Sequence, residues 1–301
     1  MSAEAENGIA LIVPTYERAA ALRVNLGTML QLSGISEVVI VNDGSKDDTL
    51  EVCRQFADPR LRVISHPTNL GVAAARNTGI DAARGEWIVF GEDDCRFPSD
   101  YASVLLQEAR KHGADLVGAP VLHKRSRDED IHQVARSAPR SERPSMEEVG
   151  TFPTHTVETP FIPAPALIRR SVFDRVRFYE GFPVNGYREE TDLFVQAVRA
   201  GFRSILTPAT FCYQVDTWSG GQHHSSSVRY EYWVLRNNWR FLRRHGRWLS
   251  EHGYIKGPIG SQLRFTLGRA RIVATGVTRG RIARYSSRRA ARREVARQRA
   301  G

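Results

Sequence analysis

Cysteine is scarce in this 301-residue chain, and its spacing excludes several kinds of site. The three cysteines are Cys53, Cys95 and Cys212, and they form neither a CxxC pair nor a Cys/His spacing of the kind that binds zinc. An odd, widely spaced set also argues against a disulfide framework. The pattern favours a protein of a reducing compartment.

Long apolar runs are missing as well. No run approaches the ~18 residues that a membrane-spanning helix needs. The first residues, MSAEAENG, are polar, whereas a signal peptide has a basic segment followed by a hydrophobic one. We therefore expect a cytoplasmic protein, with peripheral attachment at the inner face of the plasma membrane left open.

Two nucleotide-binding motifs and any internal repeat are also absent. No segment reads GxxxxGK[ST], and no GxGxxG follows the first predicted strand. Ordinary ATPase and dinucleotide-binding functions thereby lose their main support.

Acidic residues almost disappear toward the C-terminal end. Residues 262–301 contain twelve arginines and one acid, Glu294, which gives this segment a charge of +11. Since the whole chain carries +10, the other 261 residues sum to −1. The high isoelectric point therefore belongs to a tail and says little about the rest of the chain.

We expect residues 259–301 to form an Arg-rich tail that is helical or disordered. Its interrupted apolar residues are Leu263, Phe265, Leu267, Ile272, Val273, Val277 and Ile282. They could lie in an anionic membrane surface while the arginines meet lipid phosphates. A solvated extension, or one that packs on a partner, is the alternative. Nucleic acid is disfavoured because Tyr285 is the one aromatic residue beyond Phe265.

Apolar, β-branched runs alternate with helix-like stretches through the first 120 residues. The predicted strands are 9–14, 37–43, 61–66, 86–91 and 114–120. The predicted helices between them are 18–32, 46–57, 70–83 and 98–112. Continuous apolar strands separated by helices are typical of a parallel sheet covered on both faces. The sequence predicts the α/β class, with an open, mostly parallel sheet.

The pattern is less regular in the second half. Residues 123–160 are rich in charge, proline and serine, which indicates a long mobile excursion instead of packed elements. A helix is predicted from Glu189 to Ala200, with Gly201 as its stop. A further helix is predicted at roughly 226–245. Its stripe at helical spacing, expected to be core, is Tyr230, Trp233, Val234, Asn237 and Phe241.

Three polar motifs follow predicted strands: PTYER (14–18), NDGS (42–45) and EDD (92–94). Ligands bind beyond the carboxyl ends of an open parallel sheet, so these motifs should meet in one crevice. A solvated turn is the alternative for EDD. Adjacent carboxylates raise one another's pKa unless a cation neutralises them. Carboxylates together with substrate phosphates usually hold Mg²⁺, so the motif predicts Mn²⁺ or Mg²⁺ and a phosphate-bearing ligand.

Five segments in order resemble the family 2 glycosyltransferases, which have the GT-A fold. They read IVPTYER, EVVIVNDGSKDDT, NLGVAAARNTGI, GEWIVFGEDDCRFP and FYEGFPVNGYREETDLFVQAVRAGF. The resemblance is collinear from Ile9 to about Phe202, roughly two thirds of the chain. It implies transfer of a sugar from a nucleotide-diphosphate sugar, with UDP-sugars the commonest donors.

The resemblance also implies roles for individual residues. Those lining the nucleobase and ribose side would be Pro14, Thr15, Tyr16 and Glu17. Asp43 would contact the base, although the Asp-Gly-Ser sequence is also strong turn chemistry. Arg76 would lie near the diphosphate, with a helix-surface arginine as the alternative.

In the acidic triplet, the family pattern makes Asp94 the metal ligand and Asp93 a donor-sugar contact. Glu92 stands where aspartate is commoner, so its part in metal binding is open. Many members carry a metal-binding histidine where this chain has Tyr213 and Gln214. His223 or His224 could substitute for it, and a solvated loop is the alternative.

The segment REETDLF resembles the family's catalytic acid motif, which implies Glu190 as the general base and Glu189 as second choice. Acids in the first turn of a helix also complement its dipole, which is the structural alternative. A carboxylate base removes the proton of the attacking hydroxyl, and the family inverts the anomeric configuration by direct displacement. No covalent sugar on the protein is implied.

The sequence predicts a glycosyltransferase domain over 1–258, with a nucleotide-sugar-binding half at 9–120 and an acceptor and catalytic half at 121–258. The acceptor would be a hydroxyl of a glycan, a lipid-linked molecule or a small molecule. Two alternatives are a nucleotidyltransferase of similar fold and a non-enzymatic, basic-tailed binding protein. The first usually has a Gly-rich loop after strand one, which PTYERAAAL lacks.

Overall fold

The computed structural model describes residues 8–124, 130–143, 145, 151–215, 227–271, 273 and 274. The chain divides into two compact units, Met1–Asn237 and Asn238–Gly301. The predicted domain end at residue 258, and the division into two halves, stay predictions.

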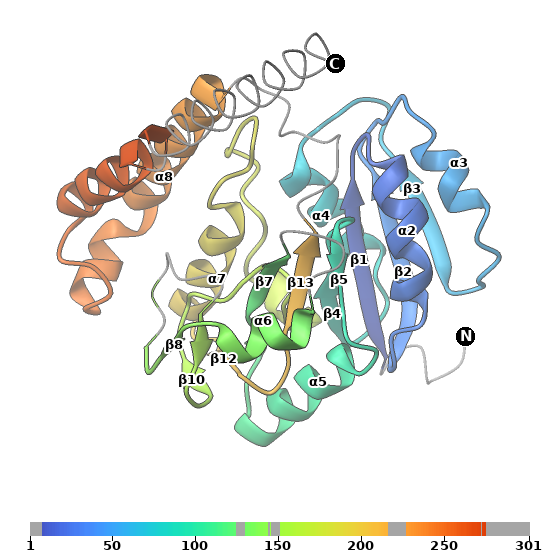
Figure 1. Ribbon diagram of the computed structural model, residues 1–301, viewed down its shortest axis with the longest axis horizontal. Helices are drawn as coiled ribbons and strands as arrows, with labels where there is room; N and C mark the ends of the chain where they lie inside the picture. Colours follow the sequence, from blue (N-terminus) through green and yellow to red (C-terminus); the bar gives the residue numbers. More distant parts are fainter. Residues whose placement is uncertain are drawn as a thin grey trace, which may run out of the picture. The chain divides into compact units, whose positions relative to one another are not determined.

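Among the described residues, the first unit is built on an eight-stranded mixed sheet (Figure 1). Its order is β10-β12-β6-β11-β4-β1-β2-β3. The strands are β1 Ile9–Thr15, β2 Ile35–Asn42, β3 Leu61–Ser65, β4 Trp87–Phe90, β6 Leu116–Gly118, β10 Val157–Glu158, β11 Leu167–Arg169 and β12 Ser204–Leu206. Strands β4, β1, β2 and β3 are parallel, and β11 is antiparallel to both of its neighbours.

Helices cover both faces of this sheet, because the central strands are apolar on both sides. One face packs against α2 Ala19–Leu30, α3 Thr49–Arg54 and α5 Tyr101–His112. The other face packs against α4 Val72–Ala82 and α7 Glu189–Arg199. Leu11 points into the first core and Ile12 into the second, as the two-residue period of a strand requires. The predicted α/β class is confirmed.

The five predicted strands and the predicted helices are present, with ends shifted by a few residues. Gly201, two residues after the end of α7, has a φ of +93°, a conformation that glycine adopts without strain. The prediction that it ends this helix is confirmed.

The predicted excursion at 123–160 is wrong for the residues that the structure describes there. They form α6 Ile131–Ser137, β8 Arg140–Ser141, β9 Phe152–Pro153 and β10, after β7 Val121–Lys124. Phe152 is buried, with its ring centroid 5.9 Å from that of Phe211 and the Arg140 guanidinium 5.4 Å from its own. Phe152 is buried by contacts with residues far along the chain. The local sequence has no hydrophobic period, so it could not predict this burial.

A second sheet, of three strands, brings distant segments beside the acidic triplet. Its order is β5-β13-β7, with β5 Cys95–Arg96 and β13 Cys212–Val215. Gln214 lies opposite Cys95 in the antiparallel register. This sheet was not predicted, and it places β13 next to the end of the EDD motif.

Helix α8, Ser227–Glu251, begins in the first unit and ends in the second. Val234, Asn237 and Phe241 are buried, whereas Tyr230 and Trp233 are partly exposed, so the predicted core stripe is confirmed for three of its five members. Residues 258–271 form a further helix in the second unit. No helix in the described ranges has the length and apolarity needed to cross a membrane.

Candidate functional site

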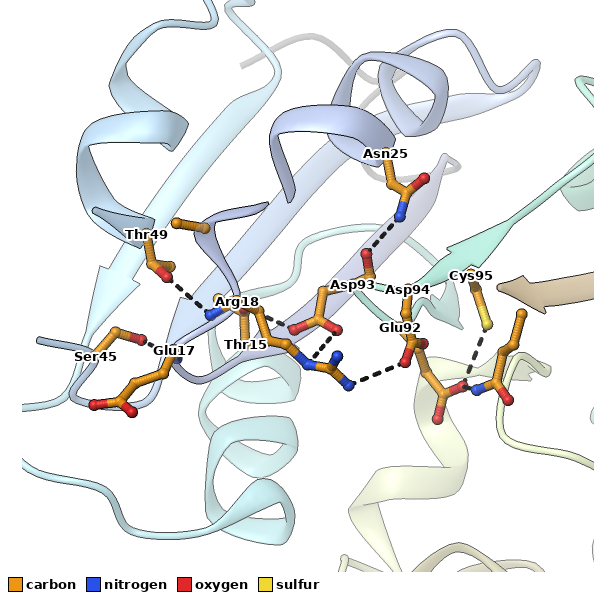
Figure 2. Close-up of polar contacts among 12 residues, drawn as sticks. Thr15, Glu17, Arg18, Asn25, Ser45, Thr49, Glu92, Asp93, Asp94 and Cys95 are labelled. Atoms are coloured by element: carbon orange, nitrogen blue, oxygen red, sulfur yellow. Dashed lines mark hydrogen bonds and ion pairs between the residues drawn. The ribbon is translucent and has the colours of Figure 1, made fainter. Parts of the chain in front are cut away.

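The acidic triplet follows β4 and lies against the end of β1. At Gly91 the backbone before the triplet packs closely on β1, since a Cβ there would lie 3.0 Å from Val13 Cγ2. Thr15 Oγ1 donates a hydrogen bond of 2.9 Å to Asp93 Oδ2, and Asn25 Nδ2 donates one of 2.9 Å to the Asp93 carbonyl oxygen (Figure 2). The backbone and side chain of Asp93 are thus both fixed.

Arg18 joins the first motif to the acidic triplet. Its Nη2 donates to Asp94 Oδ2 at 3.0 Å, and its Nε lies 3.5 Å from Asp93 Oδ1 (Figure 2). Its own backbone N–H donates to Thr49 Oγ1 at 3.2 Å. This arginine belongs to the PTYER motif, but the sequence predicted no role for it. Its position as the one basic residue of that motif was the available signal.

The loops after β1 and β2 are also joined. The Glu17 N–H donates to Ser45 Oγ at 2.8 Å, and the Ala19 N–H donates to Asp47 Oδ2 at 3.1 Å. Glu17 has a φ of +52°, the left-handed region that a non-glycine residue rarely adopts. The ends of β1, β2 and β4 therefore meet, as predicted.

Two further predicted residues lie at the end of β1 and directly after it. Pro14 is the partly buried penultimate residue of the strand. Tyr16 follows the strand, and its pKa is raised by burial and by the charges of Glu17 and Asp43. Both are thus near the joined strand ends.

Asp43 is buried, and its carboxylate holds the loop that precedes α4. Oδ1 lies 2.8 Å from His66 Nδ1 and accepts from the Leu70 N–H at 2.8 Å, while Oδ2 accepts from the Gly71 N–H at 2.8 Å. The turn expected as its alternative role is present at the neighbouring residues, where the Ser45 N–H donates to Asn42 Oδ1 at 3.1 Å and Gly44 has a φ of +74°. A contact with a nucleobase stays a prediction.

Arg76 is buried in α4, so the helix-surface alternative is wrong. Its Nη2 donates to Glu190 Oε1 at 2.7 Å and lies 3.7 Å from Glu92 Oε1, and its Nη1 pairs with Glu189 Oε1. The guanidinium carbon is 5.3 Å from the Phe178 ring centroid. One arginine thus joins the acidic triplet to both acids proposed as the base.

Carboxylates outnumber the cations that contact them at this site. Burial raises the pKa of Glu92 to about 8, helped by the charges of Glu190 and Asp94 and opposed by that of Arg76. Burial raises the pKa of Asp93 to about 7, opposed by Arg18 and helped by Asp94. A site that resists ionisation in this way favours an additional cation.

Three side chains present atoms close enough to share a metal ion. Atoms of Glu92, Asp94 and Cys95 lie within 4.8 Å of one another. Burial raises the pKa of the Cys95 thiol well above its usual range, and its Sγ donates to Glu92 Oε2 at 3.3 Å. The two carboxylates are the donors that Mg²⁺ and Mn²⁺ prefer, so the residues present fit such an ion.

The resemblance implied a histidine at Tyr213 or Gln214, and both residues lie on β13. Gln214 Nε2 donates to Glu92 Oε2, which orients this carboxylate. Sequence reasoning missed this contact, because Gln214 and Glu92 are 122 positions apart. His223 and His224 lie outside the described residues.

A comparison with protein families matches residues 10–177 to Glycosyl transferase family 2. One relative, the uncharacterized glycosyltransferase EpsJ of Bacillus subtilis, is 34% identical over 191 residues, which cover 59% of this chain and 54% of that protein. A PGL/p-HBAD biosynthesis glycosyltransferase of Mycobacterium bovis is 41% identical over 118 residues, covering 37% and 46%. The chain thus spans about half the length of either relative.

Solved structures share the fold at low sequence identity. S. aureus TarS with UDP-GlcNAc has a TM-score of 0.56 at 16% identity, over 78% of this chain and 65% of that one. Mannosyltransferase PcManGT of Pyrobaculum calidifontis, with GDP-Man and Mn²⁺, has a TM-score of 0.56 at 21% identity, over 80% and 66%. The family match covers more than half of the chain and includes the strand ends and the acidic triplet. This chain belongs to glycosyl transferase family 2.

Proposed function

We propose that this chain transfers a sugar from a nucleotide-diphosphate sugar to an acceptor hydroxyl, with inversion at the anomeric carbon. The observation that carries the proposal is that two sets of ion pairs meet at the acidic triplet. Arg18 links the loop after β1 to Asp93 and Asp94, and Arg76 links Glu92 to Glu189 and Glu190. A transferase of this kind needs a leaving-group site and a base on opposite sides of the reacting carbon.

The donor is proposed to lie across the ends of β1, β2 and β4. The residues that would line the nucleotide side are Pro14, Thr15, Tyr16, Glu17 and Asp43. TarS was solved with UDP-GlcNAc and PcManGT with GDP-Man, and both have this fold. Diphosphate sugars are the shared ligand class, and we favour a UDP-sugar for this chain.

Asp94 and Glu92 are proposed to hold Mn²⁺ or Mg²⁺ at the diphosphate. When bound, the ion acts as a Lewis acid toward the charge that grows on the departing diphosphate. Two fold neighbours, PcManGT and GalNAc-T7, were solved with Mn²⁺. Arg18 holds Asp94 by an ion pair of 3.0 Å, and Gln214 orients Glu92, so both ligands are positioned by neighbouring side chains.

Glu190 is proposed as the general base. Its side chain is 32% exposed, whereas that of Glu189 is 4% exposed, so Glu190 is the acid that an entering hydroxyl can reach. Arg76 pairs with it at 2.7 Å, which fixes the position of its carboxylate. The base takes the proton of the attacking hydroxyl, and the nucleoside diphosphate leaves with the pair of electrons from the broken bond.

The acceptor is proposed to be a hydroxyl of a glycan, of a lipid-linked molecule or of a small molecule, on the cytoplasmic side of the membrane. The relatives include proteins named for succinoglycan biosynthesis in Rhizobium meliloti and for PGL/p-HBAD biosynthesis in mycobacteria. These names agree with an envelope or exported glycan as the product class.

The test is a panel of UDP-, dTDP- and GDP-sugars with Mn²⁺, followed by the release of nucleoside diphosphate. We expect donors with one of these nucleobases to release nucleoside diphosphate when the metal is present. The release should be faster when an acceptor is also present. Pyrophosphate as the released product would show nucleotidyl transfer instead. No release with any donor, while a nucleotide still binds, would favour a binding protein.

A further inference from the structure

The helix formed by residues 258–271 presents apolar side chains to solvent. Ile259, Leu263 and Leu267 recur every four residues, so they lie on one face. Their exposed fractions are 67%, 60% and 63%. Single exposed leucines are ordinary, but three in line on one helix make a continuous apolar stripe.

The opposite face of the same helix is the one that packs inside the second unit. Ser261 and Phe265 are buried, and Asn238 Nδ2 donates a hydrogen bond of 2.8 Å to Gln262 Oε1. Phe265, which the sequence grouped with Leu263 and Leu267 at a membrane interface, therefore points the other way. Ile259, which that group omitted, belongs to the exposed stripe.

The surroundings of the stripe are basic. Arg264 and Arg271 are exposed and lie toward one side of the stripe by helical spacing. The sequence has no aspartate or glutamate between Glu251 and Glu294. An apolar stripe with arginines beside it, in a stretch of sequence without acids, is the pattern of a helix that lies in the plane of a membrane interface.

We propose that this face, Ile259, Leu263 and Leu267 with Arg264 and Arg271, docks on the surface of an anionic lipid membrane. The apolar side chains would enter the region between headgroups and acyl chains, and the arginines would meet lipid phosphates. The stripe is on one side of the helix only, which suits lying on the surface and not crossing it. Charge complementarity selects the anionic leaflet as the occupant, since each arginine is attracted to negative lipid and repelled by a basic partner.

The docking face belongs to the second unit, whereas the acidic triplet and Arg76 belong to the first. The proposal therefore stands without the proposed reaction. If both hold, the docking face would bring the enzyme to a membrane that can carry its acceptor.

The test is co-sedimentation of the full chain with vesicles of phosphatidylglycerol and phosphatidylcholine, compared with phosphatidylcholine alone. We expect binding to the anionic vesicles that weakens as salt rises. Leu263→Gln with Leu267→Gln should weaken that binding at least roughly tenfold, since two buried leucines are lost. Arg264→Gln should weaken it roughly fivefold.

The matched control is Val24→Gln, an exposed apolar residue on α2 with 41% exposure. It should bind vesicles as the unaltered chain does, and all variants should melt together because every changed side chain is exposed. Equal binding by the double leucine variant would overturn the proposal, since the remaining arginines would then suffice. An absence of vesicle binding would overturn it too, as would a leucine-dependent dimer that binds no vesicles.

Discussion

At the scale of single residues, Arg76 compensates the negative charge of three neighbouring carboxylates. Its guanidinium contacts Glu92, Glu189 and Glu190, and its side chain is 2% exposed. A buried ion pair adds little stability when intact, but removing one partner leaves an uncompensated charge in a region with little water. The arginine is therefore needed for the fold of the site.

We expect Arg76→Met to lower the free energy of unfolding by about 3 kcal/mol. Urea denaturation measures it. The matched control is Arg177→Met, whose partner Asp81 lies at 2.7 Å in an exposed pair. That change should cost ~0.2–1 kcal/mol. Similar losses for both variants would contradict the compensating role of Arg76.

Removing the charge of Glu92 should raise the free energy of unfolding, whereas removing that of Arg76 lowers it, because the charge of Glu92 opposes folding. Its pKa is raised from 4.5 to about 8, so its penalty is absent below pH 4.5, grows as pH rises and is complete above about pH 8. Glu92→Gln should therefore stabilise the chelator-treated protein by ~1–3 kcal/mol at pH 8 and by much less at pH 5. Melting curves at the two pH values measure this. A gain that is equal at both would show that Glu92 is not destabilised by ionisation.

Glu190 and Glu189 differ in exposure, and that difference predicts their separate effects. Glu190→Gln should keep donor and metal affinity but lose transfer by ~10²–10⁴-fold, the usual contribution of a general base. Glu189→Gln should chiefly destabilise the protein, because its carboxylate is buried against Arg76. Single-turnover rates and donor titrations separate the two. If the Glu190→Gln variant is active and the Glu189→Gln variant is folded but inactive, Glu189 is the general base and Glu190 is not.

At the scale of elements, close packing of α4 on β1 depends on a glycine. A Cβ at Gly79 would overlap Ile12 Cγ2, so Gly79→Ala should cost ~1–3 kcal/mol through overpacking. Gly268, in the helix 258–271, has open space around it, so Gly268→Ala should stabilise that helix by ~0.5–1 kcal/mol. The same substitution should thus lower the free energy of unfolding at position 79 and raise it at position 268, and denaturation curves measure both changes. A stabilising Gly79→Ala would mean that α4 is not held against β1.

The elements also show what the sequence could predict. Strands such as β1 and β2 have seven and eight residues of mostly apolar character, so the sequence pattern alone predicted that they are strands and where they lie along the chain. Strands β5, β7 and β13 are about as short as β4 and β6 but contain polar or charged residues, so no apolar run marked them in the sequence. They pair through distant partners, as Gln214 does with Cys95.

The site followed the same rule. The acidic triplet and REETDLF were found because each motif is local. The contacts of Arg18 with Asp93 and of Gln214 with Glu92 span many positions, and only the folded chain brings those side chains together.

At the scale of the whole molecule, charge and chemistry occupy different parts of the chain. Residues 262–301 carry +11, while the rest of the chain, with the strand ends that meet near Asp93, sums to −1. Variants of the docking face should therefore leave ligand binding in the first unit unchanged. This separation allows the two proposals to be tested in one set of proteins.

A ligand that binds only the native state raises apparent stability, and the donor should do so only with its metal. At about 100 times its dissociation constant, the matching nucleoside diphosphate with Mn²⁺ should add ~2.7 kcal/mol, a rise in melting temperature of roughly 5 °C. Asp94→Asn should lose this rise, because the residue proposed to hold the ion loses its charge. The double leucine variant, Leu263→Gln with Leu267→Gln, should keep it. An equal rise with chelator present would show that the nucleotide binds without the metal, and Asp94 would then need another role.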